Sequence, residues 1–322
     1  MSLFSSWIAS PPPDAAIEIA ADRVTVGVIG ERSGGLVVQA YAAERLPPGA
    51  VVPSLTSSNV HNRAAVVGAL RAALDRAGAR PRRVALVVPD LAAKVSLVRF
   101  DTLPARREDL DQLVRWQVKK ASPFPIEEAL VTSTPGLRGA DGSAEFLVVT
   151  SRRDAIAEYE AVCDDLKIYA GLVDLATFSV VNLLLGGGDY PAAGDWLVVH
   201  LRPEYTSIAI MRGPHVIFFR NRPEGDEASI ADLVHQTAMY YQDRLAGERF
   251  ARVFLGGSGR AMGAVELARQ NLEERLGVAV EPIDPTRFAA LTDRISVTPD
   301  LMDVLGPLVG MALRARSESV TA

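Results

Sequence analysis

A glycine-rich turn that could hold phosphate lies in the last quarter of the chain. The apolar run that ends at Leu255 is followed by Gly256-Gly257-Ser258-Gly259 and then by a helical pattern that reaches Leu276. A strand, a glycine turn and a helix in this order can present backbone N–H groups to a phosphate. A tight turn without any ligand explains the same residues equally well. No Gly-x-x-x-x-Gly-Lys-Ser/Thr motif occurs, and no Gly-x-Gly-x-x-Gly follows an early strand, so we expect neither a P-loop nor a dinucleotide site.

Residues suited to metal binding or nucleophilic catalysis are scarce. The single cysteine, Cys163, lies in a predicted helix beside Asp164 and Asp165, whose negative charge would raise the pKa of the thiol. No Gly-x-Ser-x-Gly elbow of a serine hydrolase is present. The histidines show no ligand spacing; they are His61, His200, His215 and His235. We therefore predict no metal site and no covalent catalysis by cysteine or serine.

The elements that must position the glycine turn include two similar three-stranded meanders. Residues 196–221 contain three short apolar runs separated by turn residues, and the same pattern occurs near the N-terminus at residues 15–41. When Glu18 is aligned with His200, the two copies correspond strand for strand. Val24 then aligns with Thr206, and Leu36 aligns with Val216. Chance similarity of two hairpins is the alternative. Two copies half a chain apart predict a pseudo-symmetric protein with a cleft between its halves.

Further helices and strands surround the meanders. Helical spacing and end signals predict helices at residues 59–77, 106–120, 154–166, 229–245 and 302–314. Apolar runs predict strands at residues 82–89, 93–100, 130–134, 145–150, 252–255 and 278–281. Residues 81–168 thus form a compact β-β-α-β-β-α block between the two meanders.

The composition is that of a soluble globular protein. The 322 residues are 48% hydrophobic and 23% charged, and the formal net charge is -5. Because an acidic chain lacks the basic surface of a nucleic-acid binder, we expect no nucleic-acid partner. One cysteine fits a reducing cytoplasm. No signal peptide is recognisable, and the apolar residues 301–313 are too few for the ~20 that span a bilayer, so we expect no membrane-spanning segment, while binding to a membrane partner stays open.

Five motifs spread along the chain are specific enough to indicate a relationship. They are Leu46-Pro-Pro-Gly-Ala-Val51, Trp116 to Glu128 with its Pro-Phe-Pro-Ile-Glu-Glu end, Ala170-Gly-Leu-Val-Asp174, Phe254 to Gly259, and Gly306 to Arg314. Together they resemble the PilM family of type IV pilus assembly within the actin-like ATPase superfamily, and more distantly the FtsA cell-division proteins. The resemblance covers nearly the whole chain. It implies an α/β fold of the duplicated, ribonuclease-H-like actin type, with an inserted FtsA-type subdomain in the first half and a reduced subdomain in the second.

The same resemblance implies a division of the chain. Residues 1–13 would be a flexible leader. The first actin-like domain would comprise residues 14–80, 169–190 and about 303–322, the inserted subdomain residues 81–168, and the second actin-like domain residues 191–302. Only about ten residues separate Asn221 from Asp232, where the superfamily has a subdomain that helps to hold the nucleotide base.

The chain departs from the family pattern where a nucleotide would bind. In the superfamily, the first turn of each meander carries an Asp-Ile-Gly type sequence that holds phosphate and positions magnesium. Here the first turn is Glu18 to Arg23 and the second is His200 to Glu204, so both aspartates and both glycines are replaced, and Pro203 lacks an N–H donor. If a nucleotide site is retained, the resemblance assigns it to Glu18, Asp22, Asp174, Gly256, Gly257 and Gly259.

From these departures we predict a scaffold or adaptor of the pilus inner-membrane complex, with no cofactor required. The resemblance implies a groove between the first domain and the inserted subdomain that receives the N-terminal cytoplasmic tail of a bitopic, PilN-like protein. The protein would then be cytoplasmic and peripheral to the inner membrane through this partner, with other pilus assembly proteins or further copies of itself as additional contacts. We expect the groove residues among Val84, Leu86, Val88, Val95, Leu97 and Phe100.

Two alternatives stay open. In an active ATPase that uses ATP and magnesium, Glu18 and Asp174 would hold the ion or water, and Arg23 and Arg202 would bind phosphate in place of the lost backbone donors. The other alternative is a GspL-like cytoplasmic domain of a type II secretion system, which is also actin-like with a decayed nucleotide site. That family continues into a transmembrane helix, whereas this sequence ends at Ala322 without one.

Overall fold

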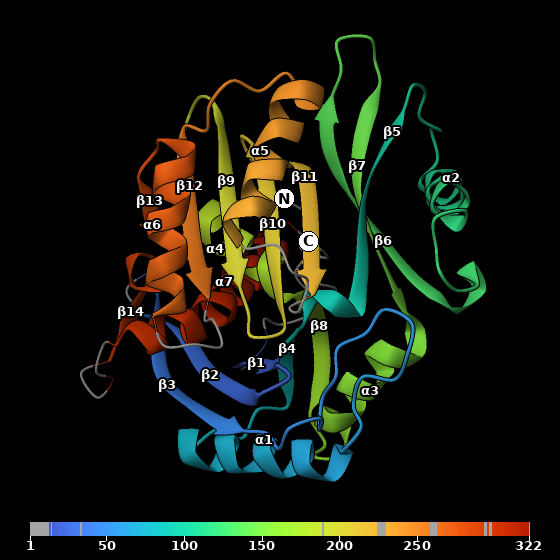
Figure 1. Cartoon of the computed structure of the whole chain (residues 1–322). Helices are drawn as coiled ribbons and strands as arrows, with labels where there is room; N and C mark the ends of the chain where they lie inside the picture. Colours follow the sequence, from blue (N-terminus) through green and yellow to red (C-terminus); the bar gives the residue numbers. More distant parts are fainter. Residues whose placement is uncertain are drawn as a thin grey trace.

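The computed structural model describes residues 13, 15–32, 34–188, 190–223, 230–257, 263–292, 295 and 298–321. Their strands form two large sheets of similar layout and a smaller third sheet (Figure 1). In these ranges no helix has the length and apolar character needed to cross a membrane.

The first large sheet has six strands in the order β14-β3-β2-β1-β4-β8. β1, β2 and β3 form an antiparallel meander, whereas β4 pairs in parallel with β1 and with β8. Every residue of β1 is buried, as expected for a central strand with both faces covered. The strands are β1 (Ala15–Ile19), β2 (Arg23–Arg32), β3 (Gly35–Arg45), β4 (Arg83–Val88), β8 (Tyr169–Leu175) and β14 (Ala289–Leu291).

The second large sheet repeats this layout with five strands in the order β11-β10-β9-β12-β13. β9, β10 and β11 form the antiparallel meander, and β12 pairs in parallel with β9 and with β13. The strands are β9 (Asp195–Leu201), β10 (Tyr205–Arg212), β11 (His215–Pro223), β12 (Arg252–Gly257) and β13 (Val280–Pro282).

The strand pairing confirms the predicted repeat. Glu18 pairs with Thr25 between β1 and β2, and His200 pairs with Ser207 between β9 and β10, which are equivalent positions in the aligned copies. An irregularity in the pairing with the third strand also recurs at the equivalent place, after Val28 in β2 and after Ile210 in β10. The two meanders therefore share register as well as sequence pattern.

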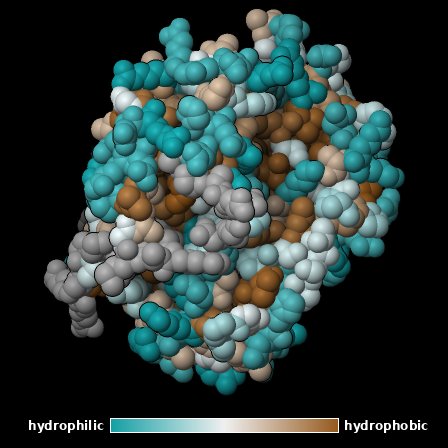
Figure 2. Space-filling view, viewed as in Figure 1, coloured by the Kyte–Doolittle hydropathy of each residue, from teal (hydrophilic) through white to brown (hydrophobic). Residues whose placement is uncertain are grey.

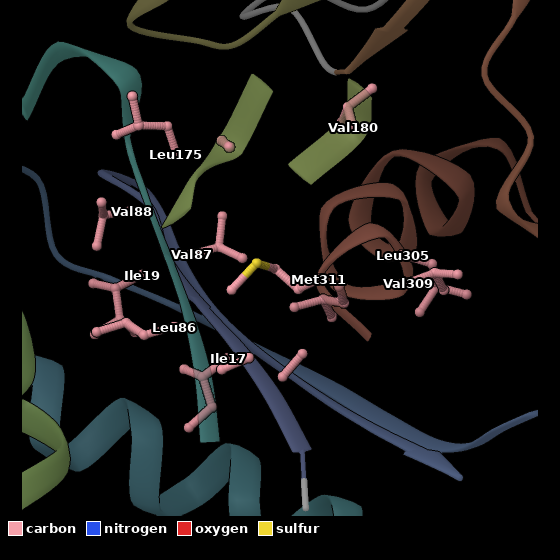
Figure 3. Packing of buried hydrophobic residues seen from close by; sticks show 14 of the residues in the cluster. Ile17, Ile19, Leu86, Val87, Val88, Leu175, Val180, Leu305, Val309 and Met311 are labelled. Carbon is pink, nitrogen blue, oxygen red and sulfur yellow. The ribbon is translucent and has the colours of Figure 1, made fainter. Parts of the chain in front are cut away.

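Two helices lie between the large sheets and join the halves. They are α4 (Ala176–Gly186) and α7 (Pro299–Thr321), which pack against each other (Figure 1). Their backbones approach closely, because a Cβ atom at Gly310 of α7 would overlap the carbonyl oxygen of Ser179 in α4. Side chains from both helices and from the first sheet form one continuous core, part of which Figure 3 shows with Val87, Val180 and Met311 labelled.

The remaining long helices cover the sheets from outside. α1 lies on the first sheet, where the Asn62 side chain caps its start by accepting the Ala65 N–H and Gly78 ends it in the left-handed conformation with φ of 64°. α5 and α6 contribute to the core of the second half. The bounds are α1 (Arg63–Ala77), α3 (Arg153–Asp164), α5 (Ile230–Leu245) and α6 (Ala264–Leu276).

The third sheet is the inserted unit. Its antiparallel strands have the order β5-β7-β6, and α2 (Arg107–Lys119) covers one face around a separate small core. The strands are β5 (Ala93–Phe100), β6 (Ala129–Arg138) and β7 (Ala144–Arg152).

Two predicted boundaries need correction. The sequence predicts β4 as part of the inserted block at residues 81–168, but β4 lies between β1 and β8 in the first large sheet. α3, at the other end of that block, packs on β8 and α1. The second correction concerns β14, which was placed in the second domain but adds to β3 of the first sheet. The inserted unit is thus confined to β5, α2, β6 and β7.

Candidate functional site

The two repeats meet at a buried ion pair. Glu18 of β1 and Arg202, which follows β9, have side chains that are each 2% exposed, and Nη2 of Arg202 lies 2.8 Å from Oε1 of Glu18. Within the described chain neither carboxylate oxygen has a well-aligned hydrogen bond, so charge attraction dominates the contact. Burial lowers the pKa of Arg202, but the nearby Glu18 and other acids raise it further, and the net shift is upward. Arg202 therefore stays charged in the interior.

A second buried acid, Asp90, also joins the halves. It begins the short helix η2 (Asp90–Ala92) directly after β4. Its carboxylate accepts hydrogen bonds from the backbone N–H of Thr177 at 3.0 Å, from the Thr177 hydroxyl, and from the Ser207 hydroxyl at 2.6 Å. Its N–H donates to Oη of Tyr205 at 3.2 Å, and its carbonyl accepts from Asn221 at 3.2 Å. Burial raises the pKa of Asp90, although these hydrogen bonds oppose the shift.

The same network determines which nitrogen of the His200 ring carries a proton. The Thr177 hydroxyl donates its only proton to Asp90, so Nδ1 of His200 must be the donor to the Thr177 oxygen at 2.9 Å. Burial, followed by the charges of Arg202 and Arg23, holds the pKa of His200 well below its usual value. The imidazole is therefore neutral, and its buried Nε2 has no hydrogen-bond partner among the described residues.

The described part of the glycine turn is used by the protein itself. Gly257 has φ of +98°, and a Cβ atom there would overlap the carbonyl oxygen of Leu201, so only glycine fits. Its N–H donates to Oδ1 of Asp303 in α7 at 3.1 Å. Gly256 is buried in β12 against Ile283. Gly259 lies outside the described residues.

The acidic residues assigned to a retained nucleotide site do not converge. Glu18 pairs with Val87, and Val87 pairs with Asp174, so the two acids stand in one row of the sheet but two strands, or about 9.5 Å, apart. Asp174 forms an ion pair with Arg314. The Asp22 carboxylate lies 3.4 Å from its neighbour Arg23. Among the described residues no group of three or more potential metal ligands comes together.

A cavity of about 540 Å³ lies between the inserted sheet and the first half. β6 and β7 line one side, β8 and α4 another, and α3, α7 and the β10–β11 turn also contribute residues. Among the described residues, β6 is an edge strand of the third sheet and β8 is an edge strand of the first, and residues of both strands line the cavity. Residues that line it include Thr132, Thr134, Leu147, Val149, Ile156, Glu160, Asp174, Phe178, Asn182 and His215.

The residues expected in a groove are distributed among three environments. Val84 and Leu86 are fully buried in the core of the first half, and Phe100 is buried in the core of the inserted unit. Val88 lines the cavity. Val95 and Leu97 lie on β5, opposite Val149 and Leu147 of β7, which line the cavity. Apolar residues also gather in a hollow over the inserted sheet in Figure 2.

Sequence reasoning did not identify Asp90 or Glu160. Asp90 comes just after the apolar run Val84 to Val88, at the carboxyl end of a strand. This is a frequent place for functional side chains in parallel sheets, so the position of Asp90 was an available signal. Glu160 lies on a charged helix face, where its type and spacing do not distinguish it from solvated residues.

Comparison with known proteins gives consistent matches. A family model described as type IV pilus assembly protein PilM matches residues 16–244. A solved PilM-PilN type IV pilus biogenesis complex is 17% identical, with a TM-score of 0.80 over 95% of this chain and 99% of that chain. A Bacteroides thetaiotaomicron protein with an actin-like ATPase fold and unknown function is 7% identical, with a TM-score of 0.50 over 95% and 98%. None of the curated proteins searched matches. These neighbours confirm the predicted actin-like fold.

Proposed function

Since this chain belongs to the family of the type IV pilus assembly protein PilM, we propose that it is an adaptor for the cytoplasmic tail of a PilN-like membrane protein. A role in pilus assembly follows from the family. The similar solved structure is a complex of PilM with PilN, which supports a partner of this kind. The adaptor would work at the cytoplasmic face of the inner membrane, held there by this tail.

The observation that supports the proposal most strongly is that two edge strands, β6 and β8, contribute residues to the lining of the cavity. An extended peptide can add main-chain hydrogen bonds to an exposed strand edge and place alternate side chains in pockets. Here β6 and β8 offer such edges, and Leu147, Val149 and Phe178 provide apolar contacts beside them. The cavity also includes Pro214 and His215 from the second half, so a bound tail would contact both halves.

We further propose that the adaptor does not hydrolyse ATP. A magnesium-bound phosphate needs free carboxylate and N–H groups where the two meanders meet. The Glu18 carboxylate is paired with Arg202, Pro203 has no N–H, and the N–H of Gly257 donates to Asp303. Arg202 also serves poorly as a phosphate ligand while Glu18 neutralises it, which weakens the case for the alternative of an active ATPase.

Binding of the tail can be tested by filling the cavity. Thr134 is exposed on β6 and lines the cavity, so Thr134→Trp would occupy the space without disturbing a core. The measurement is fluorescence anisotropy with a labelled peptide that contains the whole cytoplasmic tail of the PilN-like protein from the same organism. Thr102→Trp is the matched control, because Thr102 is an exposed loop residue outside the cavity.

We expect saturable binding to the wild type and to Thr102→Trp, and a loss of at least about tenfold in affinity with Thr134→Trp, which corresponds to ~1.4 kcal/mol. No binding to the wild type, or equal binding to all three proteins, would refute the proposed site.

A further inference from the structure

One carboxylate of the cavity has no partner among the described residues. Glu160 lies on α3 one turn after Ile156, and both residues line the cavity. Within the described part of the chain, the Glu160 side chain makes no hydrogen bond or ion pair. It is half-buried, and burial followed by the nearby Asp164 raises its pKa. A carboxylate in such a place is stabilised by a cation that enters the same space.

The other charges of the cavity are already compensated. Asp174 is paired with Arg314 and accepts a hydrogen bond from Asn182 at 3.2 Å. Among the described residues that line the cavity, the carboxylates are Glu160 and Asp174 and the guanidinium is Arg314, with His215 as the histidine; the carboxylate without a paired guanidinium is that of Glu160. The cavity therefore combines apolar contacts and strand edges with one uncompensated negative charge.

We infer that Glu160 pairs with a Lys or Arg side chain of the bound tail and thereby selects a basic peptide; this rests on the proposed function. The strand edges of β6 and β8 are indifferent to sequence, and Leu147, Val149 and Phe178 favour any apolar neighbour, so Glu160 supplies the charge discrimination. A PilN-like tail can supply this cation, because cytoplasmic segments next to a membrane span are rich in Lys and Arg. The α-amino group of the tail is the other cation that such a peptide offers.

A double-mutant cycle between the protein and the tail peptide tests the inference. The protein variants are Glu160→Gln and, as a matched control, Glu274→Gln, because Glu274 is exposed on α6 away from the cavity. The peptides are the wild-type tail, tails with each Lys or Arg changed to Gln, and an N-acetylated tail. Anisotropy titrations at low and high salt give the dissociation constants.

We expect Glu160→Gln to weaken binding of the wild-type tail by about tenfold and Glu274→Gln to leave it unchanged. One Lys→Gln or Arg→Gln peptide should lose a similar factor with the wild-type protein and little more with Glu160→Gln, and acetylation should have no effect. Equal affinity of wild type and Glu160→Gln, or a loss only on acetylation, overturns the role of Glu160 while the tail still binds. Failure of the tail to bind at all instead overturns the proposed function.

Discussion

Asp90 receives hydrogen bonds from both halves of the molecule. It accepts from Thr177 of α4 and from Ser207 of β10, and its backbone bonds to Tyr205 and Asn221. At the residue scale, these contacts explain why a carboxyl group is tolerated in the interior. Because Asp90→Ala would leave the Thr177 and Ser207 donors buried and unpaired, we predict a loss of about 3 kcal/mol in the free energy of unfolding.

Urea denaturation measures this effect, with Asp111→Ala as the control because Asp111 is exposed on α2. The control should change stability by less than about 0.5 kcal/mol. If both variants have the same stability as the wild type, Asp90 does not hold the halves together.

His200 gives the junction a dependence on pH. Its pKa is depressed in the folded protein by burial and by Arg202 and Arg23, whereas the unfolded chain takes up a proton near the ordinary value of 6.5. The unfolded state therefore binds more protons below that pH, and the stability due to neutral His200 is lost as pH falls below about 6.5. We predict that the stability difference between wild type and His200→Asn falls by about 1.4 kcal/mol per pH unit there.

Urea titrations between neutral and mildly acidic pH measure this difference. Parallel curves for wild type and His200→Asn would show that His200 titrates normally in the folded state.

Some residues of the junction could be recognised from the sequence, but the hydrogen bonds and ion pairs between them could not. Glu18, His200 and Gly257 were recognised because repeats and glycine turns leave local patterns. The pairing of Glu18 with Arg202 and the contacts of Asp90 join residues that are far apart in the chain, so no local spacing reveals them.

At the scale of elements, the contact between α4 and α7 depends on one glycine. A Cβ atom at Gly310 would overlap the Ser179 carbonyl, whereas a Cβ atom at Gly306, one turn earlier in α7, would stand 3.9 Å from Val180 in ordinary contact. We predict that Gly310→Ala costs about 2 kcal/mol by forcing the helices apart. Gly306→Ala should be neutral or stabilising by up to ~1 kcal/mol, because alanine favours the helix.

Thermal or urea unfolding measures the stability of the two variants. Both carry the same glycine-to-alanine change in α7, so a difference between them reports the contact with α4. Equal stability of both variants would mean that α4 and α7 adjust to the added methyl group and that their close approach is unimportant.

Strand and helix positions were largely predictable, but membership of a sheet was not. In the sequence, β4 lies between α1 and the inserted strands, and its apolar sequence fits either the first sheet or the inserted sheet. Its position is decided by parallel pairing with β1 and β8, which are distant in sequence. The placement of β14 beside β3 has the same cause, since a three-residue strand has no pattern of its own.

At the scale of the whole molecule, Glu18 and Arg202 join one repeat to the other. Because both are buried, removal of one partner leaves an uncompensated charge in the interior. We predict that Glu18→Met alone costs about 3–5 kcal/mol, and that Glu18→Met with Arg202→Met costs less than the two single changes added together.

A double-mutant cycle by urea unfolding measures this coupling. The exposed pair of Arg106 and Asp109 is the control, for which Arg106→Met should cost less than about 0.5 kcal/mol. Additive effects of Glu18→Met and Arg202→Met would show that the buried pair does not couple the halves.

The duplicated architecture was the most predictable property of the molecule, because two copies of one pattern specify the same strand order twice. The cavity was not predictable in detail, since it is formed where the inserted unit, α3, α4 and the second half meet.

We propose that the tail of a PilN-like protein binds in this cavity without the help of a nucleotide. Titration calorimetry of the protein with the tail peptide tests it directly, after any nucleotide has been removed and again with ATP and magnesium present. We predict saturable one-to-one binding with the same affinity in both conditions. Binding that requires ATP, or no binding in either condition, would show that the protein is not a nucleotide-independent adaptor for this tail.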